Sequence, residues 1–203
     1  MPPVIPNSRR IRAFASEAAF ETWLAHHHDT EPEVWIKIHK KGSELASITP
    51  AQAIDVALCF GWIDGIRKSF DDRSFLQRYT PRTRKSRWSR INVEHVARLV
   101  AADRMTPHGQ RQVDAAKADG RWAAAYAPMR GMTGGSLPKD LRAAIAKNPR
   151  ARKTFRTLNA HNLFALAFRT GAMKTPAGRA KKIAALVATL ERGEPIVPPR
   201  RKH

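Results

Sequence analysis

The chain has 203 residues, of which 42% are apolar, and this is enough to bury a core without disulfides or a structural metal. Its single cysteine, Cys59, excludes an intramolecular disulfide and a zinc site built from several thiolates. The 37 Lys and Arg residues outnumber the 17 Asp and Glu residues, and the net charge of +20 indicates a surface that attracts phosphates, nucleic acid or anionic lipid headgroups.

The amino-terminal segment has the composition of a tail. Residues 1–12 contain three prolines and three arginines but no continuous apolar run of the kind that a secretory signal needs. Residues 56–63, the longest uncharged stretch near the middle of the chain, are far fewer than the roughly 20 apolar residues of a membrane span. We therefore expect a disordered tail over residues 1–12, no transmembrane segment and a cytoplasmic location.

The first regular elements that the sequence predicts are a helix and a strand. Phe20, Trp23 and Leu24 recur at the spacing of one helix face, and Ser16 is placed to cap a helix that ends near His28. Residues 34–39 follow as an alternating segment with valine and isoleucine on one face, which is the pattern of a half-buried strand.

A second helix and a hairpin come next. Thr49 and Pro50 form a helix start, because the threonine hydroxyl caps the free amides and proline at the first position loses no hydrogen bond. This helix is expected to end near Cys59. Two extended runs, residues 63–70 and 74–79, are separated by a polar turn and predict a β-hairpin.

The remainder of the chain predicts helices only. One helix opens near Ser89, and Thr-Pro pairs at residues 106–107 and 175–176 start two more. The glycine-rich residues 131–136 read as a linker, and the apolar spacing beyond them predicts short helices. All strands are therefore expected between Glu33 and Pro81.

These patterns predict an α+β fold, in which a small, mostly antiparallel sheet is packed with helices and is followed by an all-helical carboxy-terminal module. The expected parts are a tail over 1–12, an α+β domain over 13–128, a linker over 129–137, a basic helical module over 138–194 and a Pro/Arg-rich tail over 195–203. The net charge is +6 up to Pro128 and +14 afterwards, so the excess of basic residues lies mostly in the helical part.

The segment between Asp72 and Glu94 is the strongest candidate for a ligand site. It contains seven Arg or Lys residues and no acid, and it runs into the amino end of the helix that begins near Ser89, where free amides and the helix dipole also favour an anion. Arginine forks, serine hydroxyls, an amide and tryptophan rings would supply the contacts to a phosphate or carboxylate ligand. The candidate ligand-binding residues are Trp62, Asp64, Arg82, Ser86, Trp88, Ser89 and Asn92.

Each of these residues also has a purely structural interpretation. Tryptophans at positions 62 and 88 are typical core anchors, Ser89 is a helix cap, and Arg82 is placed to pair with Asp64. Asp64 alone, without a partner at informative spacing, does not define a general base. Both interpretations remain open from the sequence.

No catalytic residue, cofactor or metal site is expected. His26, His27 and His28 are consecutive on a helix, where neighbouring side chains point about 100° apart and do not all face one ion. Cys59 has no local signature of a catalytic histidine beside it, so a buried, inert thiol is the preferred interpretation.

The basic helical module favours a second class of function. Its cations lie on short helices with very few acids, which is the pattern of contact with a phosphate backbone, although no helix-turn-helix, RNP or zinc-finger signature indicates sequence-specific binding. A third class is an enzyme that acts on a phosphorylated metabolite. The candidate nucleic-acid contacts are Arg150, Arg152, Lys153, Arg156, Arg179, Lys181 and Lys182.

Several segments between about Phe14 and Tyr126 resemble the YdeI/OmpD-associated, or bacteriocin-protection, family. They are residues 34–41 (VWIKIHKK), 60–65 (FGWIDG), 79–92 (YTPRTRKSRWSRIN) and 105–109 (MTPHG), and the region 137–194 is similar to the helical carboxy-terminal module of that family. The resemblance implies a non-catalytic role in survival under membrane-active or bacteriocin stress, and association with an outer-membrane porin. It implies no specific reaction.

Overall fold

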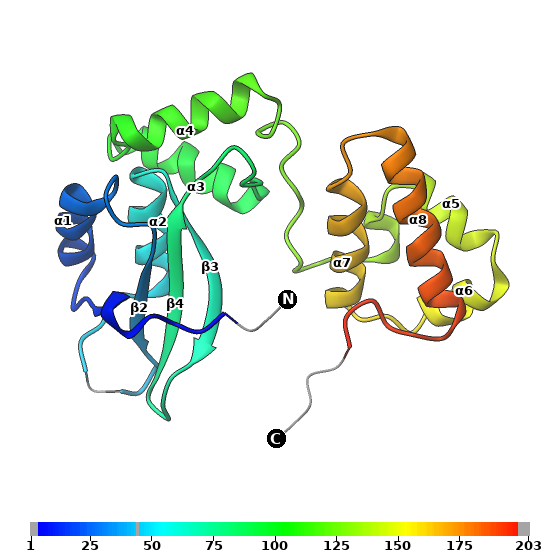
Figure 1. Cartoon of the computed structure of the whole chain (residues 1–203), viewed down its shortest axis with the longest axis horizontal. Coiled ribbons are helices and arrows are strands. Elements are labelled where there is room, and N and C mark those ends of the chain that lie inside the picture. The colour runs from blue at the N-terminus through cyan, green and yellow to red at the C-terminus, as the bar shows by residue number, and fades with distance from the viewer. Residues whose placement is uncertain (1–3, 44, 199–203) are drawn as a thin grey trace. The chain divides into compact units, whose positions relative to one another are not determined.

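The computed structural model of the protein describes residues 4–43 and 45–198 (Figure 1). The chain divides into two compact units, residues 1–125 and residues 126–203, each with its own hydrophobic core. The first unit combines a sheet with helices and the second is helical, so the predicted α+β fold class is confirmed.

The first unit is built on a four-stranded sheet with the strand order β1-β2-β4-β3. Its strands are β1 (Ile11–Ala13), β2 (Val34–His39), β3 (Trp62–Ser69) and β4 (Ser74–Pro81). β2 pairs antiparallel with β4, and β4 pairs antiparallel with β3 across a register shift between Asp64 and Arg67. The strand 34–39 and the hairpin predicted from the sequence are both present.

β1 corrects the expectation for the amino terminus. Residues 8–10 form the short 3-10 helix η1 (Ser8–Arg10), and β1 follows it as a parallel partner of β2, with Ile11 opposite Trp35. A strand therefore lies outside the interval from Glu33 to Pro81, and residues 11–12 are not a disordered tail. Three residues are too few to show an alternating pattern, and their order comes from hydrogen bonds to β2. Residues 1–3 lie outside the described part of the chain.

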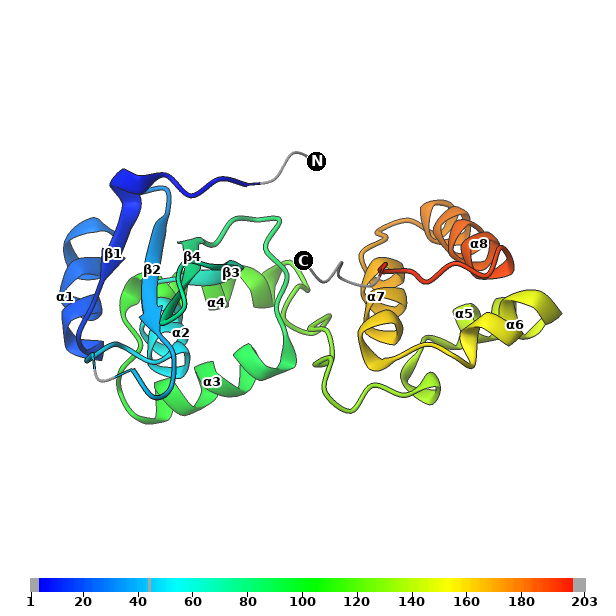
Figure 2. The ribbon, with the colours of Figure 1, turned by 90° about the horizontal axis from the view of Figure 1, so that it is seen from below.

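Four helices complete the first unit: α1 (Glu17–His27), α2 (Pro50–Cys59), α3 (Arg90–Ala101) and α4 (Pro107–Ala118). Ser16, Thr49, Ser89 and Thr106 cap them through their hydroxyls, as the sequence predicts. α2 is the centre of the helical layer, because it packs against α1, α3, α4 and β3 (Figure 1, Figure 2).

The second unit contains the 3-10 helix η2 (Gly134–Ser136) and four helices: α5 (Lys139–Ala146), α6 (Pro149–Phe155), α7 (Ala160–Gly171) and α8 (Pro176–Glu191). α8 packs against the other three. Between Gly135 and Pro198 the structure has no strand, in agreement with the prediction.

The ends of the second unit differ from the predicted boundaries. Met132 lies in the expected linker, yet only 8% of it is exposed and it packs in the second core. In the expected carboxy-terminal tail, Ile196 is buried and the backbone N–H of Val197 donates to Asn162 Oδ1 at 2.8 Å. Met132 follows a glycine, and Ile196 and Val197 lie between two prolines. Such short apolar segments show no periodicity, so the sequence pattern does not predict their burial. Residues 199–203 of that tail lie outside the described residues.

No helix in the described ranges, 4–43 and 45–198, is long and apolar enough to cross a membrane.

Candidate functional site

Two of the motif segments meet where α2 ends and α4 begins. The carbonyl oxygen of Cys59 accepts a hydrogen bond from Thr106 Oγ1 at 2.5 Å and one from the Thr106 backbone N–H at 3.3 Å. Gly109 lies so close that a Cβ there would overlap that same carbonyl oxygen, and Gly61, with φ of +74°, would place a Cβ 2.7 Å from Gln112 Cγ. The Phe60-Gly61 and Thr106–Gly109 segments are therefore required for close packing of two helix ends.

Trp62 lies inside this packing. Its side chain is fully buried, its indole N–H donates to the carbonyl oxygen of His28 at 3.1 Å, and its ring meets the Trp23 ring edge to face at 6.2 Å. The structure gives Trp62 the position of a core anchor rather than that of an exposed stacking surface.

Arg82 and Trp88 contact each other directly. The guanidinium carbon of Arg82 lies 3.5 Å from the centre of the Trp88 ring, and its Nη1 donates to the carbonyl oxygen of Arg87 at 3.3 Å. Both side chains are buried, and the Trp88 ring also packs against Trp122 at 4.8 Å. A guanidinium on an aromatic face is a favourable cation–π contact, which fixes the loop that follows β4.

The two serine hydroxyls of the candidate site bind the backbone of the same loop. Ser86 Oγ accepts from the N–H of Thr83 at 2.9 Å, and Ser89 Oγ accepts from the N–H of Asn92 at 3.1 Å. Arg121 Nη1 donates to the carbonyl oxygen of Ser86 at 3.1 Å. These contacts give residues 82–89 a defined shape, and they occupy one lone pair of each hydroxyl.

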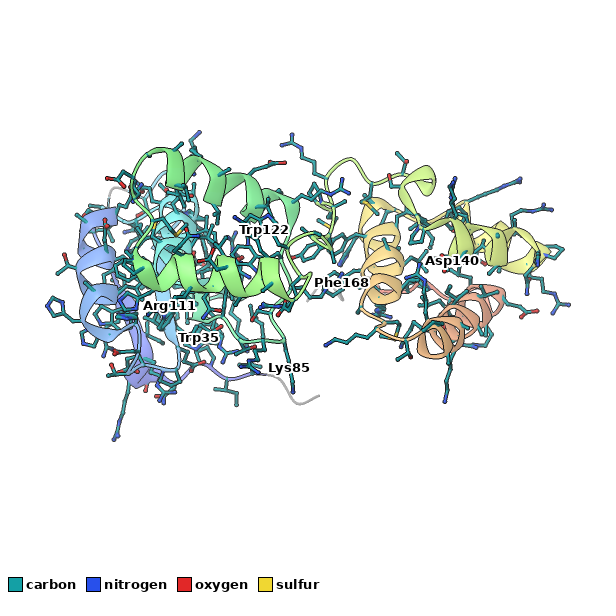
Figure 3. All side chains as sticks on the ribbon, turned by 90° about the horizontal axis from the view of Figure 1, so that it is seen from above. Trp35, Lys85, Arg111, Trp122, Asp140 and Phe168 are labelled. Atoms are coloured by element: carbon teal, nitrogen blue, oxygen red, sulfur yellow. The ribbon has the colours of Figure 1, made fainter. Side chains whose placement is uncertain are left out.

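The loop also carries cations that point outward. Arg84, Lys85 and Arg90 are exposed, and none of them forms an ion pair within the described ranges. Figure 3 shows Lys85 at the periphery of the first unit, away from its helices. Arg90 begins α3, whose first turn contains no acidic residue, so the positive end of the helix adds to these charges.

Asp64 is the acidic residue of the candidate site. It lies on β3, and partial desolvation of its carboxylate by the surrounding protein raises its pKa, although a backbone hydrogen bond and the charges of Arg82 and Arg67 oppose this by stabilising the carboxylate. Asp64 is opposite Tyr79 in the sheet register. Arg82 stabilises the charge of the Asp64 carboxylate electrostatically, in keeping with the structural interpretation of the sequence.

One polar cluster has no counterpart in the sequence analysis. Asp55 of α2 accepts from Arg98 Nη2 at 2.7 Å and contacts His95 Nδ1 at 2.7 Å, and both partners lie on α3. Burial alone would raise the pKa of Asp55. The hydrogen bonds and charges of Arg98 and His95 together outweigh burial, so the pKa lies below its ordinary value. The partners are separated by 40 residues or more in sequence, and no local motif connects them.

The histidines of the tract make separate contacts. His27 stacks on Trp23 at 4.7 Å, whereas His28 Nε2 contacts His108 Nδ1 at 2.9 Å, and Arg111 Nη2 lies 2.6 Å from the same His108 nitrogen. Within the residues that the structure describes, no group of three or more His, Cys, Asp or Glu side chains is arranged to hold a metal.

Cys59 is buried, and burial raises the pKa of its thiol to about 11. A thiol with this pKa is protonated at neutral pH and is a poor nucleophile.

The candidate nucleic-acid residues of the second unit divide into two groups. Arg150, Arg152, Lys153 and Arg156 are exposed on or just after α6, Lys181 is exposed on α8, and Lys182 beside it is half-buried. Arg179 instead binds Asp140 of α5 through Nε at 2.6 Å and Nη2 at 2.9 Å, and donates from Nη1 to the carbonyl oxygen of Thr170 at 3.1 Å. Arg179 thus connects helices, while the cations of α6 remain available to a ligand.

The fold and these sites define a protein with an α+β domain that displays a cationic loop and with a basic four-helix module. Two family models match it. Residues 136–193 match the family described as "Bacteriocin-protection, YdeI or OmpD-Associated", and the chain therefore carries a domain of that family. Residues 12–112 match a domain of unknown function (DUF8412). No curated protein and no solved structure matches the chain.

The family resemblance is thus confirmed, with a difference in where it lies. The motifs quoted for it occur between about Phe14 and Tyr126, whereas the matching family model covers the helical module, and the motif-bearing part matches the domain of unknown function. In this chain, the FGWIDG and MTPHG motifs of the first unit serve the close packing of two helix ends, and the motif over residues 79–92 includes the loop that Arg82 and Trp88 hold.

Proposed function

We propose that this protein of the bacteriocin-protection, YdeI type acts without catalysis, by binding a phosphate- or carboxylate-bearing ligand at residues 82–92. The observation that carries the proposal is that some side chains of the loop hold its backbone while others are exposed to solvent. Arg82, Trp88 and the two serine hydroxyls hold its backbone, while Arg84, Lys85 and Arg90 are exposed. A loop that is fixed from inside presents its cations with little further loss of entropy on binding.

In this proposal the seven candidate residues have different roles. The exposed cations and the Asn92 side chain contact the anion, together with the free N–H groups at the start of α3, where an anion is also favoured by the helix dipole. Arg82, Ser86, Trp88 and Ser89 position the loop, Asp64 attracts Arg82, and Trp62 anchors the core beneath it.

Isothermal titration with inorganic phosphate, pyrophosphate and citrate tests the proposal. The double variant Arg84→Ala, Lys85→Ala should bind at least tenfold more weakly, since charge-assisted hydrogen bonds contribute about 1.5 to 3 kcal/mol. The matched control is Lys41→Ala, Arg73→Ala, which removes the same charge from exposed positions near the β-hairpin turn. Equal weakening in both variants, or no binding by the parent at low salt, would contradict a site at this loop.

The variant Arg82→Ala separates positioning from contact. Because the Arg82 guanidinium is buried on the Trp88 ring, its removal should lower the melting temperature of the first unit as well as the affinity. A variant that keeps the parent's melting temperature and loses affinity would instead make Arg82 a direct ligand contact.

A second candidate function is non-specific binding of nucleic acid by the helical module. Residues 126–198 contain 14 Lys or Arg and three acids, and two of the acids, Asp140 and Glu194, are already in ion pairs. Fluorescence anisotropy with mixed-sequence DNA and RNA should show affinity that falls steeply with salt, and Arg152→Glu, Lys153→Glu should flatten that slope. Unchanged slopes in this variant and a loss in the Arg84, Lys85 variant would assign the contact to the first unit.

The cytoplasmic location and the association with a porin stay predictions. Fractionation of cells that produce the tagged protein checks the first, and co-purification of the porin with it checks the second.

A further inference from the structure

A polar pocket lies in the second unit where α6 ends and α7 begins, and the segment that follows α8 forms its other wall. Its volume is about 550 Å³, which is within the roughly 300 to 1,000 Å³ of pockets that hold small molecules. The pocket belongs to the second unit, whereas the loop of the proposed function belongs to the first. An inference about the pocket is therefore independent of that loop.

A buried asparagine joins the two walls of the pocket. Asn162 of α7 is 6% exposed, and its Oδ1 accepts from the backbone N–H of Val197 in the segment after α8. Its Nδ2 donates to Oδ1 of Asn159, the residue before α7, at 3.1 Å. Ile196 is buried in the second core and anchors the segment after α8. The walls are therefore held by the fold, and binding needs little further ordering of the chain.

The lining of the pocket carries hydrogen-bonding groups but no charged residue. Residues 126–198 contain 14 Lys or Arg. Among the residues that the structure describes, none of those lining the pocket is Asp, Glu, Lys or Arg. Because strong sites for phosphates and carboxylates use such cations, this lining favours a neutral ligand. Its hydrogen-bonding side chains are those of Thr154, Thr157, Asn159, His161 and Asn162.

The two threonines of the lining are left with acceptor capacity. Thr157 Oγ1 donates to the carbonyl oxygen of Thr154 at 2.8 Å, and Thr154 Oγ1 donates to that of Arg150 at 3.4 Å. A hydroxyl has a single hydrogen, so what these two can still offer to a ligand is lone pairs. A ligand that binds them must donate, and an ionised carboxylate has no hydrogen to donate.

Asn159 and His161 add donors to these acceptors. Within the described ranges, Asn159 Nδ2 and the ring nitrogens of His161 form no hydrogen bond. An amide N–H needs an acceptor on the ligand, and a neutral imidazole has one donor and one acceptor. The lining therefore matches a ligand whose polar groups both donate and accept, which is the property of a hydroxyl. Leu158 and Pro195 provide apolar surface for its C–H groups.

We propose that this pocket binds a neutral polyhydroxylated ligand, of the class of a mono- or disaccharide. The hydroxyls of the sugar bind Thr157, Asn159 and His161, and its C–H face packs on Leu158 and Pro195.

Proton–nitrogen correlation spectra of the full chain, titrated with glucose, N-acetylglucosamine and maltose up to tens of millimolar, test the proposal. Amide resonances of residues 157–163 and of the non-proline residues of 193–198 should shift and saturate with at least one of these sugars. Permethylated glucose keeps acceptors but has lost its donors, so it should bind at least about tenfold more weakly than glucose. Citrate should leave these resonances in place.

A matched pair of variants places the contact. Thr157→Val removes a pocket hydroxyl and should weaken sugar binding about fivefold, and adding His161→Ala should weaken it further. The control is Thr189→Val, which also removes a hydroxyl that donates to a helix carbonyl, that of Ala185, but lies outside the pocket lining. It should bind as the parent does. Circular dichroism checks that all variants keep the parent's helix content.

Several results would overturn the proposal. They are the absence of a saturable shift at these residues with all three sugars, equal affinity for glucose and its permethylated form, and equal weakening by the two valine substitutions. Tighter binding of citrate than of the sugars at the same residues would make the pocket an anion site and would refute the proposal as well.

Discussion

The substitution Gly109→Ala tests whether close packing explains the motif at the start of α4. In an ordinary helix interior this change stabilises a protein by about 1 kcal/mol, because alanine has the higher helix propensity. Here the added methyl group overlaps the carbonyl oxygen of Cys59 and lies 2.5 Å from Met105 Sδ. Since the first obstacle is backbone, the end of α2 and the start of α4 must separate, and the Thr106–Cys59 hydrogen bonds at that junction are strained.

Overpacking costs about 1 to 3 kcal/mol, and an obstacle made of backbone places the cost near the upper end of that range, so about 2 kcal/mol of destabilisation remains after the gain in propensity. For a unit of about 125 residues this corresponds to a decrease of about 8 °C in melting temperature. All five tryptophans lie in the first unit, so tryptophan fluorescence follows its unfolding without a signal from the second unit.

The control for this experiment is Gly120→Ala. Gly120 has φ of +78° and open space around the position of a Cβ, so this substitution carries only the cost of the left-handed backbone, roughly 1 kcal/mol. Truncation of Met105 to alanine should not rescue Gly109→Ala, because the Cys59 carbonyl stays in place. A Gly109→Ala protein that melts at or above the parent's temperature would refute the packing argument.

Three further predictions concern titratable groups. Because the folded-state pKa of Asp55 is lowered, its contribution to stability is present above its ordinary pKa of about 4 and is lost as the pH falls through the folded-state value. Urea titrations followed by tryptophan fluorescence should show this loss of stability at low pH, and Asp55→Asn should reduce the pH dependence. Asp140→Ala removes the partly exposed pair with Arg179 and should destabilise the second unit by less than about 1 kcal/mol, seen as a lower melting temperature by circular dichroism with an unchanged tryptophan transition. The Cys59 thiol, with a pKa raised to about 11, should react slowly with a thiol reagent at pH 8 and rapidly once urea unfolds the protein.

Local signals in the sequence predicted most of the regular structure. Each capped helix of the first unit begins at the Ser or Thr that the sequence indicated, because N-capping depends only on a side chain and the two or three backbone amides that follow it. The hairpin was visible for the same reason: alternation and a polar turn are properties of neighbouring residues. β1 escaped prediction because three residues carry no periodicity.

The segment of the candidate site could be predicted from the sequence. The sequence did not predict which of its side chains hold the loop and which are exposed. The absence of acids between Asp72 and Glu94 is visible in the sequence. The fold decides which cations are buried. Arg82 packs on the Trp88 ring, and Arg121, from a distant part of the chain, donates to the carbonyl oxygen of Ser86. Composition alone does not distinguish an arginine that supports a loop from one that the loop displays.

The sequence by itself determined the charge, the capped helix starts, the hairpin and the helical character of the second unit, all of which depend on composition or on residues close together in the chain. Only the tertiary structure decided that Asp55 joins Arg98 and His95, that Gly109 lies against Cys59, and that Asn162 joins the two walls of a polar pocket. These features depend on contacts between residues that are distant in sequence, and such contacts form only when whole elements pack together.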